Sequence, residues 1–194
     1  MDKEQALNAL NARMMRECTC SLRAQATQAV PGEGSASAEI IFIGEAPGAK
    51  EDAEGRPFVG AAGKFLEEML KDIHLKREDI YITNIVKYRP PNNRDPLPEE
   101  IASCQEWLTE QIKIIQPKII VTLGRHALTH FISDKKISEA HGQAFRKTFP
   151  DIGTRVFFAL YHPAAALYNG SMRETLMRDF RKIPKVLETV KNIV

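Results

Sequence analysis

The chain has 194 residues, of which 43% are hydrophobic and 27% are charged, and its formal net charge is +2. These values are typical of one folded globular domain and exclude a disordered or fibrous protein, and the small net charge means that nucleic-acid binding would need a local basic patch. The sequence contains neither an apolar run of the ~20 residues that span a bilayer nor an export signal, so we expect a cytoplasmic protein with no membrane partner.

Residues 2–19 have apolar side chains at helical spacing and predict an amphipathic helix, which a glycine-rich connector follows up to residue 38. Four short apolar runs predict strands, at residues 39–44, 79–84, 118–124 and 155–162. Helical patterns lie between and after these runs, at residues 60–75, 97–116, 125–133 and 173–192. The alternation predicts a three-layer α/β/α sandwich around a central four-stranded, mainly parallel sheet. We expect residues 1–194 to form a single domain, on which the helix and connector of residues 1–38 pack.

Polar side chains follow the predicted strands at their carboxyl ends, where parallel sheets bind ligands. Glu45 follows the first strand, Asn84 ends the second, and His162 ends the fourth. The loop after the first strand is rich in glycine, acids and proline, and it also contains Phe58. Taken locally, Asn84 is also compatible with a turn, His162 with a core or capping position, and Phe58 with a plug over the core.

Four stretches of the chain occur in the order of the motifs of one enzyme family: GEAPGAKEDAEGRPFVGAAGKFL, YITNIVKYRPPNNRDPLPEEIASC, VTLGRHAL and HPAAAL. They resemble the family 4 uracil-DNA glycosylases, which are bacterial and archaeal repair enzymes, and the resemblance runs from about Cys20 to the final helix. It implies an enzyme that flips uracil out of DNA and hydrolyses its N-glycosidic bond, leaving an abasic site and initiating base excision repair. The expected partners are single- or double-stranded DNA that contains uracil, with free uracil as product, and we expect a monomer associated with the nucleoid.

Site roles follow from this resemblance and from the chemistry of a departing uracil anion and a cation-like sugar. Glu45 is expected to activate water and favour the cationic sugar, and His162 to donate a hydrogen bond to uracil O2. The Asn84 amide matches uracil N3–H and O4 and rejects cytosine, which presents the reversed pattern. Phe58 is expected to stack on the base, and Glu45 or Ala46 to crowd its C5 position. The supporting loop comprises Gly44, Pro47, Gly48, Glu51 and Asp52, of which the last two are weaker candidates for the catalytic carboxylate.

Basic residues near the strand ends predict a rim that contacts DNA phosphates: Lys87, Arg89, Arg94 and Arg173. The alternative for each is ordinary solvated surface. Residues 164–171 resemble the loop that enters the duplex in this superfamily, with Leu167 or Tyr168 as the wedge.

Family 4 members typically hold a [4Fe–4S] cluster with four cysteines, and this chain departs from that pattern. Cys20 and Cys104 match the second and fourth positions, Tyr88 occupies the third, and Glu17 falls at the first unless Cys18 takes its place. Because a cubane cluster needs four soft thiolates, we expect no metal cluster and no other cofactor. The alternative is a 4Fe-4S cluster with a non-standard ligand set.

Two rival functions deserve a test. The first is a non-catalytic or covalently trapping uracil-DNA-binding protein of the same superfamily. The trapping branch has a histidine-bearing insert that RPPNNRDP lacks, and Glu45 and His162 favour turnover. The second is a nucleotide-binding module, which would need a G-x-G-x-x-G or G-x-x-x-x-G-K-[ST] loop that the sequence does not contain.

Overall fold

A computed structural model describes residues 2–192, so Met1 and residues 193–194 of the expected domain lie outside the described part. Within that part, the sheet has six strands in the order β1-β3-β2-β4-β6-β5. The strands are β1 (Glu33–Gly34), β2 (Ile40–Gly44), β3 (Tyr81–Asn84), β4 (Ile119–Leu123), β5 (Ala144–Phe149) and β6 (Gly153–Leu160).

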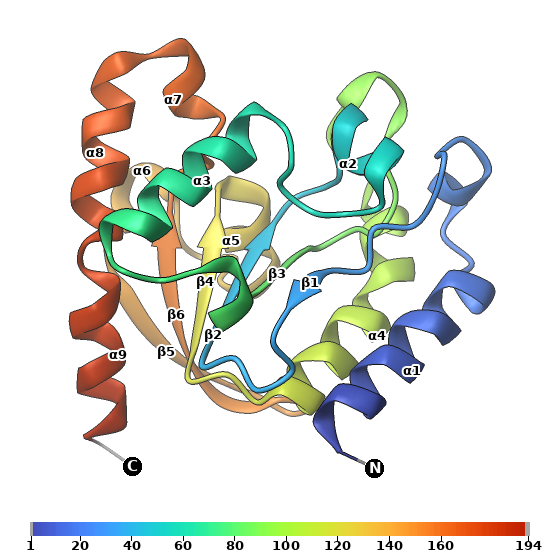
Figure 1. Ribbon diagram of the computed structural model, residues 1–194, viewed down its shortest axis with the longest axis horizontal. Helices are drawn as coiled ribbons and strands as arrows, with labels where there is room; N and C mark the ends of the chain where they lie inside the picture. The colour runs from blue at the N-terminus through green and yellow to red at the C-terminus, as the bar shows by residue number, and fades with distance from the viewer. Residues whose placement is uncertain (1, 193–194) are drawn as a thin grey trace.

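Helices cover both faces of this sheet (Figure 1). The α-helices are α1 (Lys3–Glu17), α2 (Ala49–Glu54), α3 (Ala61–Asp72), α4 (Pro98–Ile115), α5 (Arg125–Phe131), α6 (Ile137–Ala140), α7 (Ala165–Tyr168), α8 (Gly170–Phe180) and α9 (Ile183–Lys191). Short 3₁₀ turns lie at η1 (Ser21–Ala24), η2 (Arg77–Asp79) and η3 (Pro91–Asn93). One core joins the sheet to α1, α4 and α5, and a second joins it to α3, α8 and α9. The predicted three-layer α/β/α sandwich is therefore confirmed.

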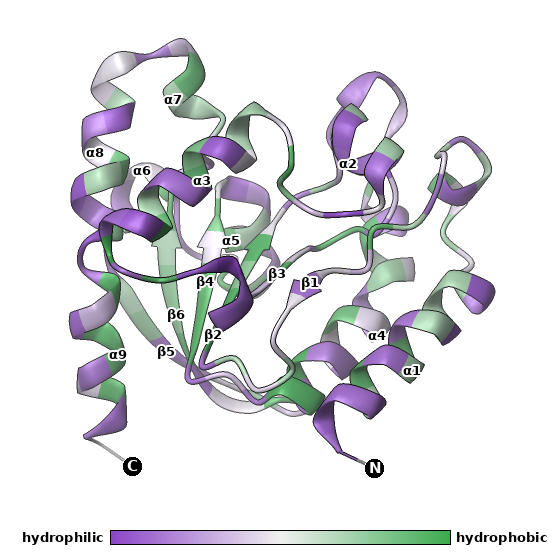
Figure 2. Ribbon diagram, viewed as in Figure 1, coloured by the Kyte–Doolittle hydropathy of each residue, from purple (hydrophilic) through white to green (hydrophobic). Residues whose placement is uncertain are grey.

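The central strands are buried on both faces, which explains why their sequences lack alternation. Ile41 and Ile43 of β2 belong to the core beneath α1 and α4, whereas Ile40 and Phe42 belong to the core beneath α3 and α8. Figure 2 shows β2, β4 and β6 mainly in the green of hydrophobic residues. Burial of each strand between two helical layers fixes which way its side chains face.

The predicted number of four strands was wrong, although the four central strands lie where the apolar runs placed them. The pairs β2/β3, β2/β4 and β4/β6 are parallel, and antiparallel β1 and β5 extend the two edges. β1 is only two residues long, and β5 alternates between exposed and half-buried residues. Edge strands of this kind carry little of the hydrophobic pattern from which a strand is predicted.

The predicted C-terminal helix of residues 173–192 is two helices, α8 and α9. Pro184 lies in the first turn of α9, where its ring is tolerated but where a continuous helix would lose a backbone hydrogen bond. The short helices α2, α6 and α7 were not predicted. None of the helices within residues 2–192 is long and apolar enough to cross a membrane.

The topology fixes where a ligand can bind. β3 and β4 lie on opposite sides of β2, so the chain reverses its direction of winding at β2. Crevices form at such reversal points, beyond the carboxyl ends of the parallel strands. The residues that follow β2, β3, β4 and β6 therefore meet at one edge of the sheet.

Candidate active site

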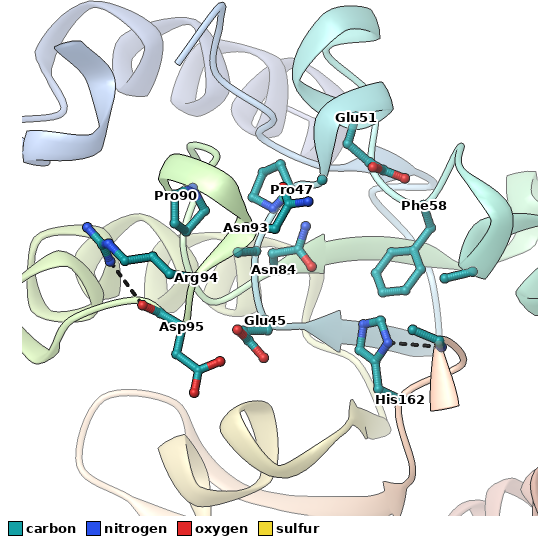
Figure 3. Close-up of a pocket in the computed structure, with 14 residues that line it drawn as sticks. Glu45, Pro47, Glu51, Phe58, Asn84, Pro90, Asn93, Arg94, Asp95 and His162 are labelled. Atoms are coloured by element: carbon teal, nitrogen blue, oxygen red, sulfur yellow. Dashed lines mark hydrogen bonds between the residues drawn. The ribbon is translucent and has the colours of Figure 1, made fainter. Parts of the chain in front are cut away.

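A cavity of about 380 Å³ opens at this edge, and Figure 3 shows the residues around it. Glu45 enters it from the end of β2, Asn84 from the end of β3, and His162 from beyond β6. Phe58 joins them from the loop between α2 and α3. The acid, amide, imidazole and aromatic ring that the sequence singled out thus line a single cavity, together with Ala46, Pro47, Gly48, Glu51 and Arg94.

Asn84 is held close to the end of β2. The backbone N–H groups of Ile85 and Val86 donate to the carbonyls of Gly44 and Glu45, at 3.0 and 3.1 Å. A Cβ atom on Gly44 would stand 2.5 Å from Asn84 Oδ1, so only glycine permits this approach. Within the described residues, the buried Asn84 Oδ1 has no hydrogen-bond partner. Such an acceptor costs roughly 1–3 kcal/mol until a ligand N–H pairs with it.

Phe58 forms the aromatic wall of the cavity. Its ring stacks on that of His162, with centroids 5.6 Å apart and an interplanar angle of 28°. Its φ of 52° lies in the left-handed region, which is strained for a bulky residue. Glu51 Oε1 holds the following turn, because it accepts hydrogen bonds from Val59 N at 2.9 Å and Gly60 N at 2.8 Å.

Asp52 does not line the cavity, so the prediction of Asp52 as a weaker candidate for the catalytic carboxylate was wrong. It is buried on the other side of α2, where its Oδ1 accepts a hydrogen bond from Thr27 N at 2.9 Å and its Oδ2 one from Thr27 Oγ1 at 2.6 Å. A helix turns successive residues to different sides, so neighbouring Glu51 faces the cavity and Asp52 faces the N-terminal connector.

His162 is a neutral hydrogen-bond donor in this geometry. The backbone N–H of Ala164 donates to His162 Nδ1 at 3.1 Å, so the ring proton resides on Nε2. Burial lowers the pKa of His162 to about 4, against a smaller opposing effect of Glu51. Near neutral pH the imidazole is therefore uncharged and still has one N–H to donate.

Glu45 has a charged environment that sequence reasoning missed. Burial raises its pKa, His126 lowers it, Asp95 raises it, and Arg125 lowers it, in order of decreasing size. His126 lies three residues after the end of β4, so its place after the third apolar run was a usable signal. Asp95 comes from the loop before α4, and its sequence surroundings gave no signal.

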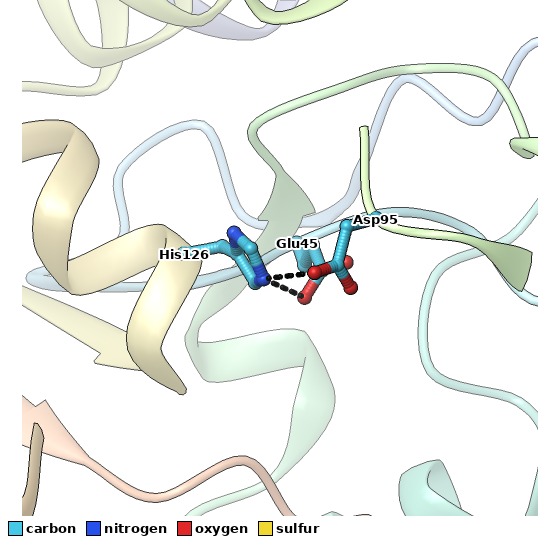
Figure 4. A group of neighbouring side chains, drawn as sticks. All are labelled: Glu45, Asp95 and His126. Carbon is cyan, nitrogen blue, oxygen red and sulfur yellow. Dashed lines mark ion pairs between the residues drawn. The ribbon is translucent and has the colours of Figure 1, made fainter. Parts of the chain in front are cut away.

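Glu45, Asp95 and His126 have ligand atoms that all lie within 4.8 Å of one another (Figure 4). Three such donors resemble a metal site, but Arg125 already occupies the group. Its Nη2 lies 2.7 Å from Asp95 Oδ2, and its Nε donates to His126 Nε2 at 2.9 Å. The Arg125 guanidinium thus pairs with two of the three residues and supplies a positive charge beside them.

The prediction that Lys87 belongs to the DNA-binding rim was wrong. It is fully buried, and its Nζ donates to Thr83 Oγ1 at 2.6 Å, Gln111 Oε1 at 2.8 Å and the carbonyl of Asn84 at 2.9 Å. Burial lowers its pKa to about 7. Three converging acceptors draw the side chain inward, so it supports Asn84 from below and contacts no phosphate.

Of the other candidate DNA contacts, Arg94 lines the cavity, and the rest lie in the loop after β3 and on α7 and α8. Arg94 pairs with Glu100 at 2.6 Å, and Arg89 Nε donates to Asn93 Oδ1 at 2.8 Å. On α8, exposed Arg173 forms an ion pair with Glu68 and lies over the Phe65 ring. Two apolar side chains project from α7, where Leu167 is 45% exposed and Tyr168 is 90% exposed. These five residues are at least partly exposed, and their contact with DNA stays a prediction.

The three cysteines meet where α1 ends against α4, and their thiols are all buried and free of disulfides. A hydrogen bond from Cys104 lowers the pKa of Cys18 to about 6, and the same contact raises the pKa of Cys104. Tyr88 is buried in the same core, its hydroxyl has no partner within residues 2–192, and burial raises its pKa to about 12. Three cysteine thiols and a phenol do not supply the four thiolates that a cubane cluster needs.

Comparisons with known proteins agree with this geometry. A family model described as the uracil DNA glycosylase superfamily matches residues 31–187. A type-4 uracil-DNA glycosylase of Sulfurisphaera tokodaii is 50% identical, over 89% of this chain and 80% of its own length. The corresponding proteins of Saccharolobus solfataricus and Thermotoga maritima are 48% and 40% identical, over 90% and 93% of this chain and 84% and 94% of their own lengths. With a fold, a strand-end cavity and a sequence that all correspond, the chain belongs to the uracil DNA glycosylase superfamily and, within it, to the type-4 branch.

Proposed function

We propose that the protein is a DNA repair glycosylase that hydrolyses the bond between uracil and deoxyribose and leaves an abasic site, which initiates base excision repair. The observation that carries this proposal is the unpaired Asn84 Oδ1 in a cavity that also holds Glu45, Phe58 and His162. The names of the type-4 relatives support uracil-containing DNA as the substrate. We propose further that the DNA is single- or double-stranded and that the product is free uracil.

Uracil recognition follows from hydrogen-bond complementarity. The base must leave the duplex to reach the cavity, which costs a few kcal/mol of stacking. Asn84 Oδ1 then accepts the N3–H of uracil while its amide nitrogen donates to O4. Cytosine has an acceptor at N3 and a donor at N4, so it would leave both amide groups unpaired at roughly 1–3 kcal/mol each. Phe58 supplies the flat apolar face, and Ala46 borders the base.

We expect catalysis to depend on a carboxylate and a hydrogen-bond donor that are already in position before the substrate binds. As the glycosidic bond breaks, the His162 Nε2–H donates to uracil O2, where negative charge develops, and the imidazole stays neutral. The Glu45 carboxylate orients water toward the sugar C1′ carbon and stabilises the positive charge there. The water oxygen forms the new bond to C1′, one of its protons passes to Glu45, and the uracil anion leaves with the bonding pair. Removal of one preorganised donor typically costs ~10²–10³ in kcat.

The decisive experiment incubates the protein with single- and double-stranded oligonucleotides that contain one uracil, then cleaves with alkali and measures released base. We expect strand scission and free uracil from the wild type, loss of both in Glu45→Gln, and no change in the exposed control Glu54→Gln on α2. A band shift without base release, or a covalent protein–DNA adduct, would instead establish the binding or trapping alternative.

We also propose that this activity needs no iron–sulfur cluster or other cofactor. The support is that this corner offers three thiols and the Tyr88 phenol where a cluster needs four thiolates. None of these four residues lines the cavity. Iron and sulfide analysis of anaerobically purified protein tests the proposal. A full complement of both would establish a cluster with a non-standard ligand set.

The oligomeric state and location of the protein are proposals of the same kind. One chain supplies every residue that the chemistry above uses, so we propose that a monomer acts alone. Light scattering coupled to size exclusion tests this, and uracil release that rises with the square of protein concentration would contradict it. A DNA substrate implies a cytoplasmic, nucleoid-associated protein, which fluorescence imaging of a fusion protein checks.

A further inference from the structure

A charge network next to Glu45 has no part in the reaction as described. His126 Nε2 lies 3.7 Å from Glu45 Oε2 and 3.2 Å from Asp95 Oδ2 (Figure 4). Arg125 contacts both His126 and Asp95. The Glu45 and His126 side chains are 27% and 22% exposed, so water screens their contact only in part.

The members of this network come from separate parts of the chain, and the fold brings them together. Glu45 follows β2, Asp95 belongs to the loop between η3 and α4, and Arg125 and His126 begin α5 immediately after β4. Asp95 and Arg125 are 30 residues apart in sequence. Their convergence therefore depends on the packing of the sheet.

The network acts on Glu45 from two elements with opposite signs. From α5, His126 and Arg125 favour the ionised carboxylate, and from the loop before α4, Asp95 opposes it. Arg125 Nε donates to His126 Nε2, which requires a neutral His126 with its own proton on Nδ1. A protonated His126 gives up this contact and turns a charged Nε2–H toward Glu45 and Asp95. The remaining ionisable groups that line the cavity are Glu51, Arg94 and His162.

We propose that His126 is a positioning residue for the glycosylase reaction: Arg125 and Asp95 hold its ring beside the Glu45 carboxylate, where it favours the charged form of Glu45 that orients water. This inference rests on the proposed function, because it assigns Glu45 the task of orienting that water. His126 itself touches neither the base nor the sugar.

The test compares the pH dependence of uracil release in His126→Ala and Asp95→Asn. Removal of His126 should move the acidic limb of the kcat profile toward neutral pH by roughly one unit, so that kcat falls about tenfold on that limb while KM changes little. Removal of the Asp95 charge should move the limb the opposite way. His126→Gln, which retains an amide near the position of Nε2, should restore part of kcat without restoring the position of the limb.

A loss of fold cannot produce shifts of opposite sign, and Asp95 is exposed, so its variant tests the inference even if His126→Ala is unstable. His74→Asn is the matched control, since His74 is exposed and its positive φ suits asparagine. The inference would be overturned if the acidic limb of the kcat profile did not move in His126→Ala and Asp95→Asn, or if it moved in the same direction in both variants.

A second measurement separates this inference from the proposed function. NMR titration of the ¹³C-labelled Glu45 carboxyl reports its ionisation without any substrate. We expect the pKa of Glu45 to rise in His126→Ala and to fall in Asp95→Asn. If these shifts occur in a protein that releases no uracil, the proposed function is refuted and the influence of the network on Glu45 is supported. If the variants are active and the Glu45 titration is unchanged, the proposed function is supported and the influence of the network is refuted.

Discussion

The ring of Phe58 stacks on the imidazole of His162 across the wall of the cavity, with a centroid separation of 5.6 Å. The stack joins the residue expected to hold the base to the residue expected to stabilise its leaving charge. Phe58→Leu keeps an apolar side chain and removes the flat face, so KM for uracil release should rise by about tenfold, within the ~1–3 kcal/mol of one base–aromatic stack. Steady-state kinetics on a single-stranded substrate measure this. An unchanged KM would show that Phe58 only fills the core.

His162 should make the fold sensitive to acid. Burial lowers its pKa to about 4, below the ~6.5 of an exposed imidazole. Between these values the unfolded chain binds more protons than the folded one, so this contribution to stability is complete above pH ~6.5 and is lost as the pH falls toward ~4. His162→Gln should lack this loss. Urea unfolding of both proteins across this pH range tests it, and parallel stability curves would contradict the burial argument.

Asn84→Asp should change which base is released. A carboxylate has acceptors only, so it cannot donate to uracil O4, but it can accept from the N4 amino group of cytosine. We expect uracil release to fall and the ratio of cytosine to uracil release to rise, as measured by chromatography of the freed bases. Asn8→Asp adds the same charge at an exposed position of α1 and should change neither value.

Gly44→Ala tests the close approach at the base of the cavity. The added methyl group would stand 2.5 Å from Asn84 Oδ1 and 2.6 Å from Phe58 Cζ, so both side chains would have to shift. We expect kcat/KM to fall by more than tenfold, which is about 1.4 kcal/mol of transition-state stabilisation. Ser37→Ala is the control, because Ser37 is an exposed residue of the N-terminal connector that does not line the cavity, and it should leave kinetics unchanged.

Lys87→Met should destabilise the fold. The substitution leaves Thr83 Oγ1, Gln111 Oε1 and the Asn84 carbonyl without their buried donor, at roughly 1–3 kcal/mol for each group that stays unpaired. We expect the free energy of unfolding to fall by at least ~2 kcal/mol in urea denaturation. Lys50→Met, at an exposed position of α2, should stay within about 0.5 kcal/mol of the wild type. Equal stabilities for the two variants would argue against a structural ammonium.

Local sequence was enough to place the elements that build the site. Backbone sterics and burial fix a short apolar run as a strand and an amphipathic period as a helix, and both patterns are visible within ten to twenty residues. The carboxyl ends of the strands then indicated Glu45, Asn84 and His162 as neighbours, and the structure places all three in one cavity. The topology rule that relates strand ends to ligand sites made this step possible.

Only the tertiary structure decided whether certain polar side chains face the core or the solvent. It also decided which charged side chains contact one another. Lys87 reads as surface, yet Thr83 and Gln111 draw it inward, and the contact with Gln111 crosses 24 residues of sequence. Asp95 reaches His126 only because the loop before α4 folds over the end of β4. Such contacts depend on the packing of distant segments, where burial and pairing outweigh local propensity, and no short stretch of sequence encodes them.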